Sequence, residues 1–455
     1  MKGRLPPLVI PRSPLRLQQE YICPRCLHSR SNTIRRSLRL GAEYPQTRRR
    51  NQSSWAQVAT ATQDLLNGAK TETTYAGVSI DPLRIVAKEL KFLNKNIQQL
   101  LGSGHPILDK VAKYYTNSEG KHIRPLLVLL MSRATAPIAK IPLSPATKST
   151  PINDPMSPPD ILNDVNPSSP SISPLPTASL DNEYAQEGPH ILPSQRRLAE
   201  ITELIHTASL LHDDVIDDSV ARRSSPSTNI AFGNKMAVLA GDFLLGRASV
   251  ALARLRNAEV IELLATVIAN LVEGEFMQLK NTALDELQPK WSEDTLSYYL
   301  QKTYLKSASL ISKSCRAAAL LGQNAPEVVE AAYSYGRNLG LAFQLVDDML
   351  DYTTSAKELG KPAGADLELG LATAPLLFAW KDNQQLGVLV GRKFAAEGDV
   401  EMARDLVSRS DGLEQTRALA QEYANKASDA VSKFPDSEAK DGLLEMCLKT
   451  MKRRK

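Results

Sequence analysis

Apolar residues recur at helical spacing once the chain passes residue 80. Asp81 and Pro82 come first, and aspartate at the N-cap with proline in the first turn is a typical helix start. Five apolar residues then follow one another at steps of three or four: Val86, Leu90, Leu93, Ile97 and Leu100. This spacing predicts an amphipathic helix over 81–101. We expect the folded domain to begin here, at about residue 80.

The same periodicity dominates the chain after residue 193. One apolar stripe contains Leu198, Ile201, Ile205, Ala208 and Leu211. Long segments rich in alanine and leucine follow at 237–253, 260–279, 292–321, 328–352 and 412–434. We find no convincing alternation of the kind that marks a strand, and no apolar run near the roughly 20 residues of a membrane-spanning helix. The predicted fold class is all-α, a helical bundle with polar sites between facing helices and no transmembrane segment.

Residues 134–193 interrupt the helical pattern. Thirteen prolines lie there among serine, threonine and asparagine, a density that no helix or central strand tolerates. We interpret the segment as a disordered insertion within a single helical domain over 80–455. The alternative is a linker between two domains, but 81–133 would then be a domain too short to bury an adequate core.

The basic residues are concentrated at the N-terminus. Residues 1–53 carry twelve basic and two acidic residues, a net charge of +10, which leaves −5 for the rest of a chain whose total is +5. An acidic main body argues against a nucleic-acid binder. The first segment is rich in arginine and serine, and Ile34–Leu40 mixes basic and apolar residues. This predicts a mitochondrial transit peptide over about 1–55; the alternative is a disordered basic arm without a targeting role.

Cysteine is sparse. The chain has Cys23, Cys26, Cys315 and Cys447. The first two have the spacing of half a zinc site, but no second pair follows and His28 alone cannot complete four ligands. Without a disulfide framework, the mature protein fits a reducing compartment such as the mitochondrial matrix.

Two aspartate clusters lie within the helical segments. Residues 213–218 read Asp-Asp-Val-Ile-Asp-Asp, and residues 347–351 read Asp-Asp-Met-Leu-Asp. Positions four apart share a helix face, so carboxylates within each cluster project together and repel one another. Mg²⁺ suits such oxygen ligands, because it takes one or two carboxylates and completes its shell with water and phosphate oxygens. One such cluster would fit a solvated helix face, but two clusters of the same spacing, each after an apolar stretch, favour a metal site.

Basic residues suited to a bound anion accompany the clusters. Lys121 and Arg124 lie three apart at a predicted helix start, where backbone N–H groups also favour anions. Further candidates are Arg222 and Arg223 after the first cluster, Lys302 and Lys306 on one helix face, and Lys361 after the second cluster. Each alone would fit a surface charge, so their value lies in the order in which they occur.

That order resembles the trans-polyprenyl diphosphate synthases. The two aspartate-rich motifs are Leu211–Asp218 and Phe343–Asp351. Supporting motifs are Gly120–Pro125, Glu203–Ser209, Gly241–Leu245, Glu273–Gln278 and Leu359–Pro362. The resemblance covers about 81–133 and 194–455, and it implies an isoprenoid synthase-type helical bundle with a central cavity between the helices that carry the two motifs.

The resemblance also implies a role for each matching residue. Catalytic residues that hold Mg²⁺, three ions in all, would be Asp213, Asp214, Asp217, Asp347, Asp348 and Asp351. Isopentenyl diphosphate would be held by Lys121, Arg124, His206 and Arg223, and the allylic diphosphate by Arg222, Lys306, Ser307, Gln344 and Lys361. Leu371 stands where short-chain members often carry lysine.

The implied activity is that of a Mg²⁺-dependent prenyltransferase. It would add isopentenyl diphosphate units to an allylic primer such as farnesyl or geranylgeranyl diphosphate. Ala208 and Ser209 lie five and four positions before Asp213, where the floor of the product cavity is expected and where short-chain relatives often place an aromatic ring. Their small size predicts a long product, hexaprenyl to decaprenyl. The alternative is that Ala208 is small only because two helices pack closely there.

The leader and the insertion resemble fungal members of the family that make the ubiquinone side chain. The implied protein is a mitochondrial homodimer that binds no nucleic acid and has at most peripheral contact with the inner membrane. Two alternatives remain: a shorter-chain, geranylgeranyl-type synthase and a non-catalytic subunit of a heteromeric synthase. Both aspartate clusters are intact, which argues against the second. A terpene cyclase is disfavoured because it has no second diphosphate for Lys121, Arg124 and His206 to bind.

Overall fold

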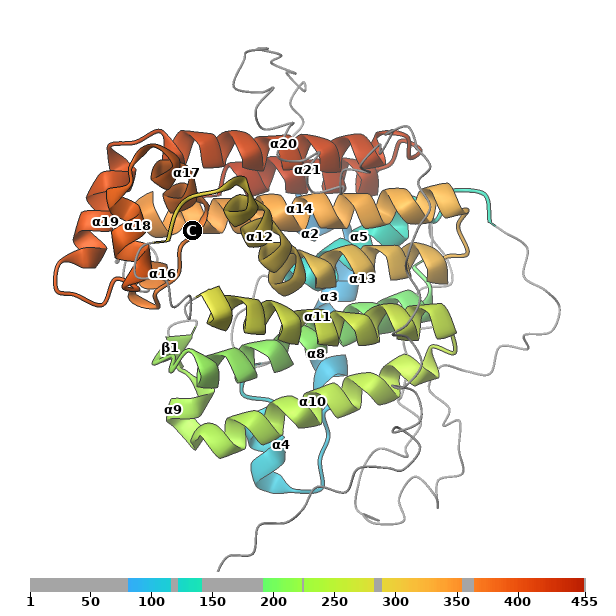
Figure 1. Ribbon diagram of the computed structural model, residues 1–455. Coiled ribbons are helices and arrows are strands. Elements are labelled where there is room, and N and C mark those ends of the chain that lie inside the picture. The colour runs from blue at the N-terminus through green and yellow to red at the C-terminus, as the bar shows by residue number, and fades with distance from the viewer. Residues whose placement is uncertain are drawn as a thin grey trace, which may run out of the picture. The chain divides into compact units, whose positions relative to one another are not determined.

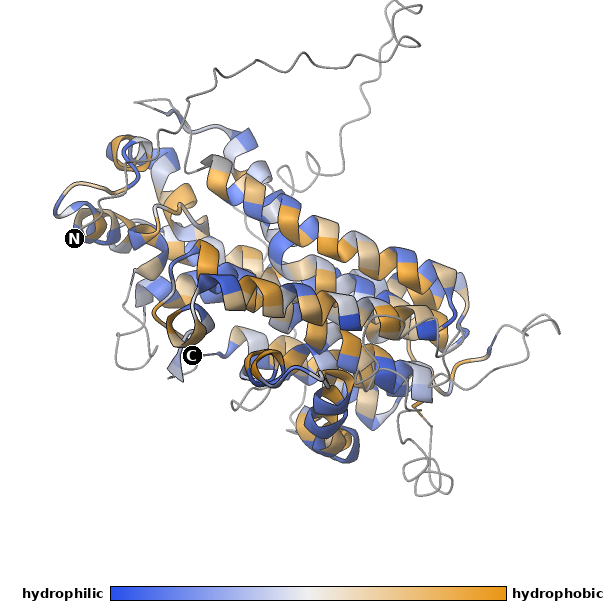
Figure 2. Cartoon of the chain, turned by 90° about the horizontal axis from the view of Figure 1, so that it is seen from below, coloured by the Kyte–Doolittle hydropathy of each residue, from blue (hydrophilic) through white to orange (hydrophobic). Residues whose placement is uncertain are grey.

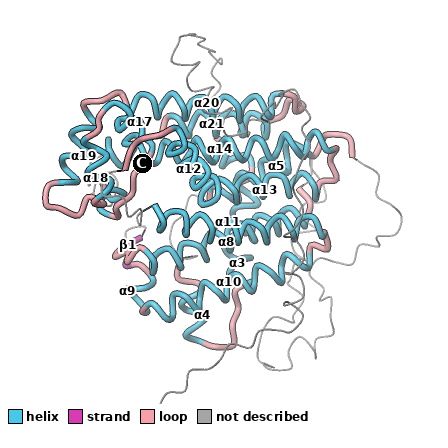
Figure 3. The backbone as a smooth tube through the Cα atoms, in the orientation of Figure 1, coloured by secondary structure: helices cyan, strands magenta, loops and turns pink. Residues whose placement is uncertain are grey.

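The computed structural model describes residues 81–115, 122–140, 191–222, 225–281, 289–353 and 364–453. The expected leader over 1–55, and residues 141–190 of the expected insertion, lie outside this part of the chain. The described residues fall within one unit, Ser53–Lys455. They are almost entirely helical (Figure 3), which confirms the all-α class.

The predicted first helix is present but broken in two. It comprises α2 (Pro82–Ile85) and α3 (Ala87–Leu100). Asp81 caps α2 as expected, since its side chain accepts a hydrogen bond from the backbone N–H of Leu83 at 3.3 Å. The break lies at Val86, where φ is −117° and ψ is 27° and the side chain is fully buried.

Helix α5 is buried on all sides. It spans Ile123–Thr135, after the short α4 (Pro106–Ala112), and every residue from Pro125 to Ser132 is buried. A helix that is apolar all round belongs in the centre of a bundle. The apolar run seen in the sequence at 125–131 is therefore core, packed against α8 (Pro193–Ile216) and α13 (Ser309–Leu321).

Helix α8 carries the first aspartate cluster and confirms the predicted apolar stripe, all five residues of which are buried. A two-stranded hairpin follows, in which β1 (Ala221–Arg222) pairs antiparallel with β2 (Ser225–Pro226). The sequence pattern did not predict these two short strands. The chain continues through α9 (Thr228–Phe232), α10 (Asn234–Arg254) and α11 (Ala258–Asn281). Figure 1 shows α10 running alongside α8, and α10 also contacts α11.

The predicted helix over 292–321 contains a π-helical segment. It consists of α12 (Glu293–Thr303), the π-helical η4 (Tyr304–Ala308) and α13. The next helix, α14 (Pro326–Thr353), carries the second aspartate cluster and packs against α13, η4 and α20. Single π turns inside α-helices are frequent at functional sites.

The C-terminal part closes the bundle beside α14. Its helices are α16 (Ala365–Glu368), α17 (Ala374–Asp382), α18 (Gln385–Gly391), α19 (Asp399–Ser408), α20 (Gly412–Ser432) and α21 (Glu438–Met451). Of these, α20 and α21 lie along α14 (Figure 1). Figure 2 shows apolar and polar residues mixed along the helices. This is expected of helices that bury one face.

Helix α10 alone, among the described helices, is long and apolar enough by length and composition to cross a membrane. It packs against α8, α4 and α9. On its outer side several large apolar residues are exposed, including Leu239 at 60% and Val250 at 45%.

Candidate active site

Asp214, near the end of α8, is held by two protein side chains. The carboxylate is fully buried. One oxygen accepts hydrogen bonds from Nε and Nη2 of Arg222, at 2.7 and 2.6 Å, and the hydroxyl of Tyr115 donates to the other. Asp214 thus ties α8 to the β1 strand and to the turn after α4. Both oxygens of Asp214 thus already have protein partners. Metal coordination by Asp214 stays a prediction.

Asp213 and Asp217 are the half-buried members of the first cluster. The pKa of Asp213 is raised to about 6, mainly by burial and also by the carboxylates of Glu275 and Asp217, while the ammonium of Lys306 opposes the rise. Burial also raises the pKa of Asp217. Several carboxylates therefore share a partly desolvated region in which Lys306 is the main opposing charge.

In the second cluster, Asp348 lies at the centre of a hydrogen-bond network. The Tyr299 hydroxyl donates to one oxygen at 2.5 Å and Nε2 of Gln344 to the other at 2.8 Å. The amide oxygen of Gln344 in turn accepts from Ser307 at 2.8 Å. Burial raises the pKa of Asp348 to about 6, although these hydrogen bonds and Lys302 favour the charged form. The network joins α12, η4 and α14.

The other two carboxylates of this cluster have different surroundings. Asp347 is partly exposed and pairs with Arg453, near the C-terminus, at 3.0 Å. The guanidinium of Arg453 also lies over the ring of Phe343, 4.4 Å from its centroid. Asp351 is buried and accepts a hydrogen bond from the backbone N–H of Asp366 at 3.2 Å. Asp351 therefore orders the chain that follows α14.

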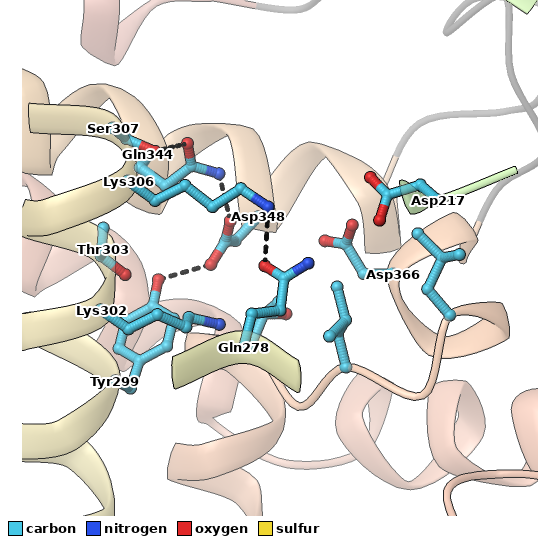
Figure 4. Close-up of a pocket in the computed structure, with 13 residues that line it drawn as sticks. Asp217, Gln278, Tyr299, Lys302, Thr303, Lys306, Ser307, Gln344, Asp348 and Asp366 are labelled. Atoms are coloured by element: carbon cyan, nitrogen blue, oxygen red, sulfur yellow. Dashed lines mark hydrogen bonds between the residues drawn. The ribbon is translucent and has the colours of Figure 1, made fainter. Parts of the chain in front are cut away.

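A pocket of about 180 Å³ lies between these elements. Figure 4 shows carboxylates and ammonium groups from several helices pointing into it. Its lining residues are Asp217, Gln278, Tyr299, Lys302, Thr303, Lys306, Ser307, Gln344, Asp348, Asp366, Leu369, Leu371 and Thr373. One cavity thus brings together residues of both aspartate clusters and the predicted anion-binding side chains of η4.

The π-helical η4 presents Lys306 and Ser307 to this pocket. Nζ of Lys306 pairs with Glu275 of α11 at 2.5 Å and donates to Gln278 at 3.1 Å. At Gly274 a Cβ atom would lie only 3.0 Å from the backbone nitrogen of Lys306. Glycine at this position allows α11 to approach η4 closely.

A second polar group lies where α5 meets α8. Nη1 of Arg124 lies 2.9 Å from Nε2 of His206. A guanidinium can only donate, so Nε2 accepts and a neutral His206 carries its proton on Nδ1. Beside this pair, Nδ1 of His122 lies 3.1 Å from a carboxylate oxygen of Glu203. His206 precedes Asp213 by seven residues, or about 10 Å along the helix, so a second anion could lie near the first cluster.

The sequence profile described as "Polyprenyl synthetase" matches residues 176–407. The chain belongs to the polyprenyl synthetase family. It is 65% identical to the "Probable hexaprenyl pyrophosphate synthase, mitochondrial" of Neurospora crassa, over 93% of both chains. It is 47% identical to the "Hexaprenyl pyrophosphate synthase, mitochondrial" of Saccharomyces cerevisiae, over 86% of this chain and 94% of that one.

A solved member of the polyprenyl synthetase family has the same fold. The polyprenyl synthase of Caulobacter crescentus, crystallised with calcium and isoprenyl diphosphate, matches with a TM-score of 0.65 and 29% identity. The match covers 84% of this chain and all of that one. The resemblance stated from the sequence motifs, the isoprenoid synthase-type fold and the prenyltransferase class are confirmed.

Some of the predicted site residues are not among the described residues that line the pocket. Lys121, Arg223 and Lys361 lie outside the described residues. Ala208 is fully buried in the core, and Ser209 donates its hydroxyl to the backbone carbonyl of His206. Neither lines the pocket of Figure 4, so their role at the product floor stays a prediction.

Lys302 was among the sequence candidates for a bound anion, but four other polar residues that line the pocket were given no role there: Tyr299, Thr303, Asp366 and Thr373. Tyr299, Lys302 and Lys306 are spaced by three and four positions, which places them on one side of α12 and η4. That spacing is the signal that could have found Tyr299. Asp366 lies in the short helix α16 after α14, and no pattern in the sequence marks it.

The donor chemistry of the pocket fits a hard divalent cation that is shared with a ligand. Among the described residues, no group of three or more acidic, histidine or cysteine side chains is arranged to hold a metal alone. Mg²⁺ is commonly bound through one or two carboxylates, with phosphate oxygens and water supplying the rest. Asp213 and Asp217, close to one another and to Glu275, offer carboxylates of this kind.

Proposed function

We propose that the protein is a long-chain trans-polyprenyl diphosphate synthase. It would add isopentenyl diphosphate units to an allylic primer such as farnesyl or geranylgeranyl diphosphate. The observation that carries this proposal is the pocket into which α8 brings Asp217, α14 brings Asp348 and η4 brings Lys306. Carboxylates facing one another across a cavity, with ammonium groups between them, suit a diphosphate bound together with divalent cations.

The two diphosphates would occupy different places. The allylic diphosphate lies between the aspartate clusters, where Lys306, Ser307 and Gln344 supply donors. Isopentenyl diphosphate lies by Arg124 and His206, whose contact joins α5 to α8. Lys121, Arg223 and Lys361 complete these sites in the proposal.

The reaction needs no protein nucleophile. The C1–O bond of the allylic primer breaks and diphosphate leaves with the electron pair, which creates an allylic cation. The double bond of isopentenyl diphosphate attacks C1, and the proton then lost from C2 passes to the released diphosphate. Divalent cations, three Mg²⁺ ions in this proposal, would supply positive charge for the leaving group when bound. Lys306 adds to that charge from η4, while Tyr299 and Gln344 hold Asp348 in place.

The product is proposed to be hexaprenyl or longer and to become the ubiquinone side chain, in mitochondria and specifically in the matrix. The names of the Neurospora crassa and Saccharomyces cerevisiae relatives support a hexaprenyl product and a mitochondrial location. Ala208, a small residue on α8 before the first cluster, is consistent with room for a long chain. Contact with the inner membrane would be peripheral.

The functional form is proposed to be a homodimer. Large apolar side chains are exposed along the neighbouring helices α10 and α11, among them Leu239, Phe276 at 68% and Val272 at 53%. An exposed apolar face of this kind marks an interaction surface, and a second copy of the chain would cover it. Light scattering of the purified protein would give twice the monomer mass; a monomer would contradict this assignment.

The activity is tested with the purified mature protein, labelled isopentenyl diphosphate and each candidate primer. We expect incorporation that requires a divalent cation and dephosphorylated products of hexaprenyl length or longer. Products that stop at geranylgeranyl length would contradict the long-chain assignment. Absence of any product, from a folded protein with metal and primer present, would indicate a non-catalytic subunit.

A further inference from the structure

Lys302 is a buried cation in the wall of the pocket. It is the last residue but one of α12, and only 7% of its surface is exposed. Lysine is almost never so buried unless its charge is paired. Figure 4 shows its side chain running beside Tyr299 toward the cavity that it helps to line.

The ammonium of Lys302 lacks an oxygen partner within the described part of the chain. Among those residues its Nζ forms no hydrogen bond and no ion pair, and its close contact is with the ring of Tyr299, 5.5 Å from the centroid. A cation–π contact offsets only part of the penalty of burying a charge. Asp348 lies nearby, but Tyr299 and Gln344 already donate to its two oxygens.

Lys306, one turn further on, provides the contrast. Its Nζ is already held by Glu275 at 2.5 Å and by Gln278 at 3.1 Å. A ligand that approaches Lys306 must therefore share it with two protein groups. Lys302 has three N–H donors and no such commitment, so an anion in the pocket gains a charge-assisted hydrogen bond there without breaking one.

We propose that Lys302 binds the diphosphate group that enters this pocket. This rests on the proposed function, because that function supplies the ligand. The same chemistry is presented by the allylic substrate and by the inorganic diphosphate released from it. Lys302 thus adds a donor to the anion-binding set formed by Lys306, Ser307 and Gln344.

The test compares full-length wild type with Lys302→Met, which keeps an apolar stem and removes the charge. Lys313→Met is the matched control, since Lys313 lies on α13 outside the pocket and donates to Thr266. Titration calorimetry with inorganic diphosphate and Mg²⁺ should show binding at least about tenfold weaker in Lys302→Met, the scale of one lost charge-assisted hydrogen bond. Lys313→Met should bind as wild type does, and Lys302→Arg should recover most of the affinity.

Steady-state kinetics then separates the two sources of diphosphate. A KM for farnesyl diphosphate raised at least about tenfold, with an unchanged KM for isopentenyl diphosphate, assigns Lys302 to the substrate. Weaker inorganic diphosphate binding with an unchanged KM assigns it to the released product. Both results support the proposal. Unchanged diphosphate binding together with an unchanged KM overturns it.

Thermal unfolding without ligand distinguishes binding from a structural role. Removing an unpaired buried charge should leave the unfolding midpoint unchanged or raise it. A lowered midpoint with unchanged diphosphate binding would mean that Lys302 serves the fold, and would overturn the proposal. If Lys302→Met does not fold, Lys302→Gln takes its place in every measurement. A wild type without condensation activity refutes the proposed function instead, whatever Lys302 does.

Discussion

Replacing Gly340 with alanine tests whether the π-helical η4 must keep its present position. Gly340 lies on α14, and a Cβ there would come within 2.7 Å of Cα and Cβ of Ala308, the last residue of η4. Ordinary contact begins at 3.4 Å, so the two elements must separate by about 0.7 Å or more. Overpacking of this kind costs about 1–3 kcal/mol. The better helix propensity of alanine returns about 1 kcal/mol.

The loss of activity should exceed what this change in stability would suggest. Ser307 directly precedes Ala308, and its hydroxyl donates to Gln344 at 2.8 Å. A separation of about 0.7 Å would stretch that bond to about 3.5 Å, beyond useful hydrogen-bond range. Misplacement by 1 Å can reduce a rate by about 100-fold. We expect a kcat about 10- to 100-fold lower, measured as labelled isopentenyl diphosphate incorporated per folded enzyme.

Gly336→Ala is the matched control. It lies one turn earlier on α14, and its Cβ would come 2.7 Å from Cα of Ser312 and 2.8 Å from the carbonyl oxygen of Ile311, both on α13. It should lower the unfolding midpoint by a similar amount but retain most of kcat. Wild-type kcat in Gly340→Ala, or equal loss of kcat in both variants, would refute the reasoning.

Four further predictions follow from single features. Asp347→Ala should abolish most turnover without changing the far-UV circular dichroism, because this partly exposed carboxylate adds little packing; excess chelator should have the same effect, and full activity without metal would contradict both. Ala208→Phe should shorten the dephosphorylated products seen by chromatography, whereas unchanged length with a lower unfolding midpoint would mean that Ala208 only serves helix packing. Replacing 136–190 with a short Gly/Ser linker should leave activity largely unchanged; a folded but inactive variant would reveal a role for the insertion. The hydrogen bond from Arg392 lowers the pKa of Asp399. The stability that this pair contributes is therefore complete above the unfolded-state pKa of Asp399, and it is lost as the pH falls through the lower folded-state pKa of the same carboxyl group. Urea midpoints of wild type and Arg392→Gln should therefore differ at pH 7 and converge in acid.

The helices could be predicted because each buries one periodic apolar face, but their irregularities could not. The break at Val86 is invisible in the sequence, since Val86 itself continues the apolar spacing on which the prediction rested. The π turn of η4 uses residues that suit an ordinary α-helix. Its position is fitted to Gly274 and Gly340, from two other helices, and such tertiary contacts leave no mark in the local pattern.

The same limit applies to the candidate site. Spacing alone identified the aspartate clusters and put Lys302 and Lys306 on one helix face, whereas the role of Lys306 came from the resemblance to the trans-polyprenyl diphosphate synthases. Spacing could not reveal the hydrogen bond from Tyr115 to Asp214, because Tyr115 lies 99 positions earlier in the chain. Lys302 was visible as a charge on a helix, but its burial was not, since burial depends on the helices that pack around it.

The three carboxylates of the second cluster differ in how readily they could accept a divalent cation. Asp348 would have to give up hydrogen bonds from Tyr299 and Gln344 in a buried setting, where broken hydrogen bonds are expensive. Asp351 would have to release the backbone of Asp366. Asp347 has only to exchange the guanidinium of Arg453, and both side chains of that pair are partly exposed, so the ion pair contributes little, about 0–1 kcal/mol. A divalent cation should therefore bind most readily in the second cluster at Asp347, which lies outside the lining of the pocket, while Asp348 keeps the contacts that order η4.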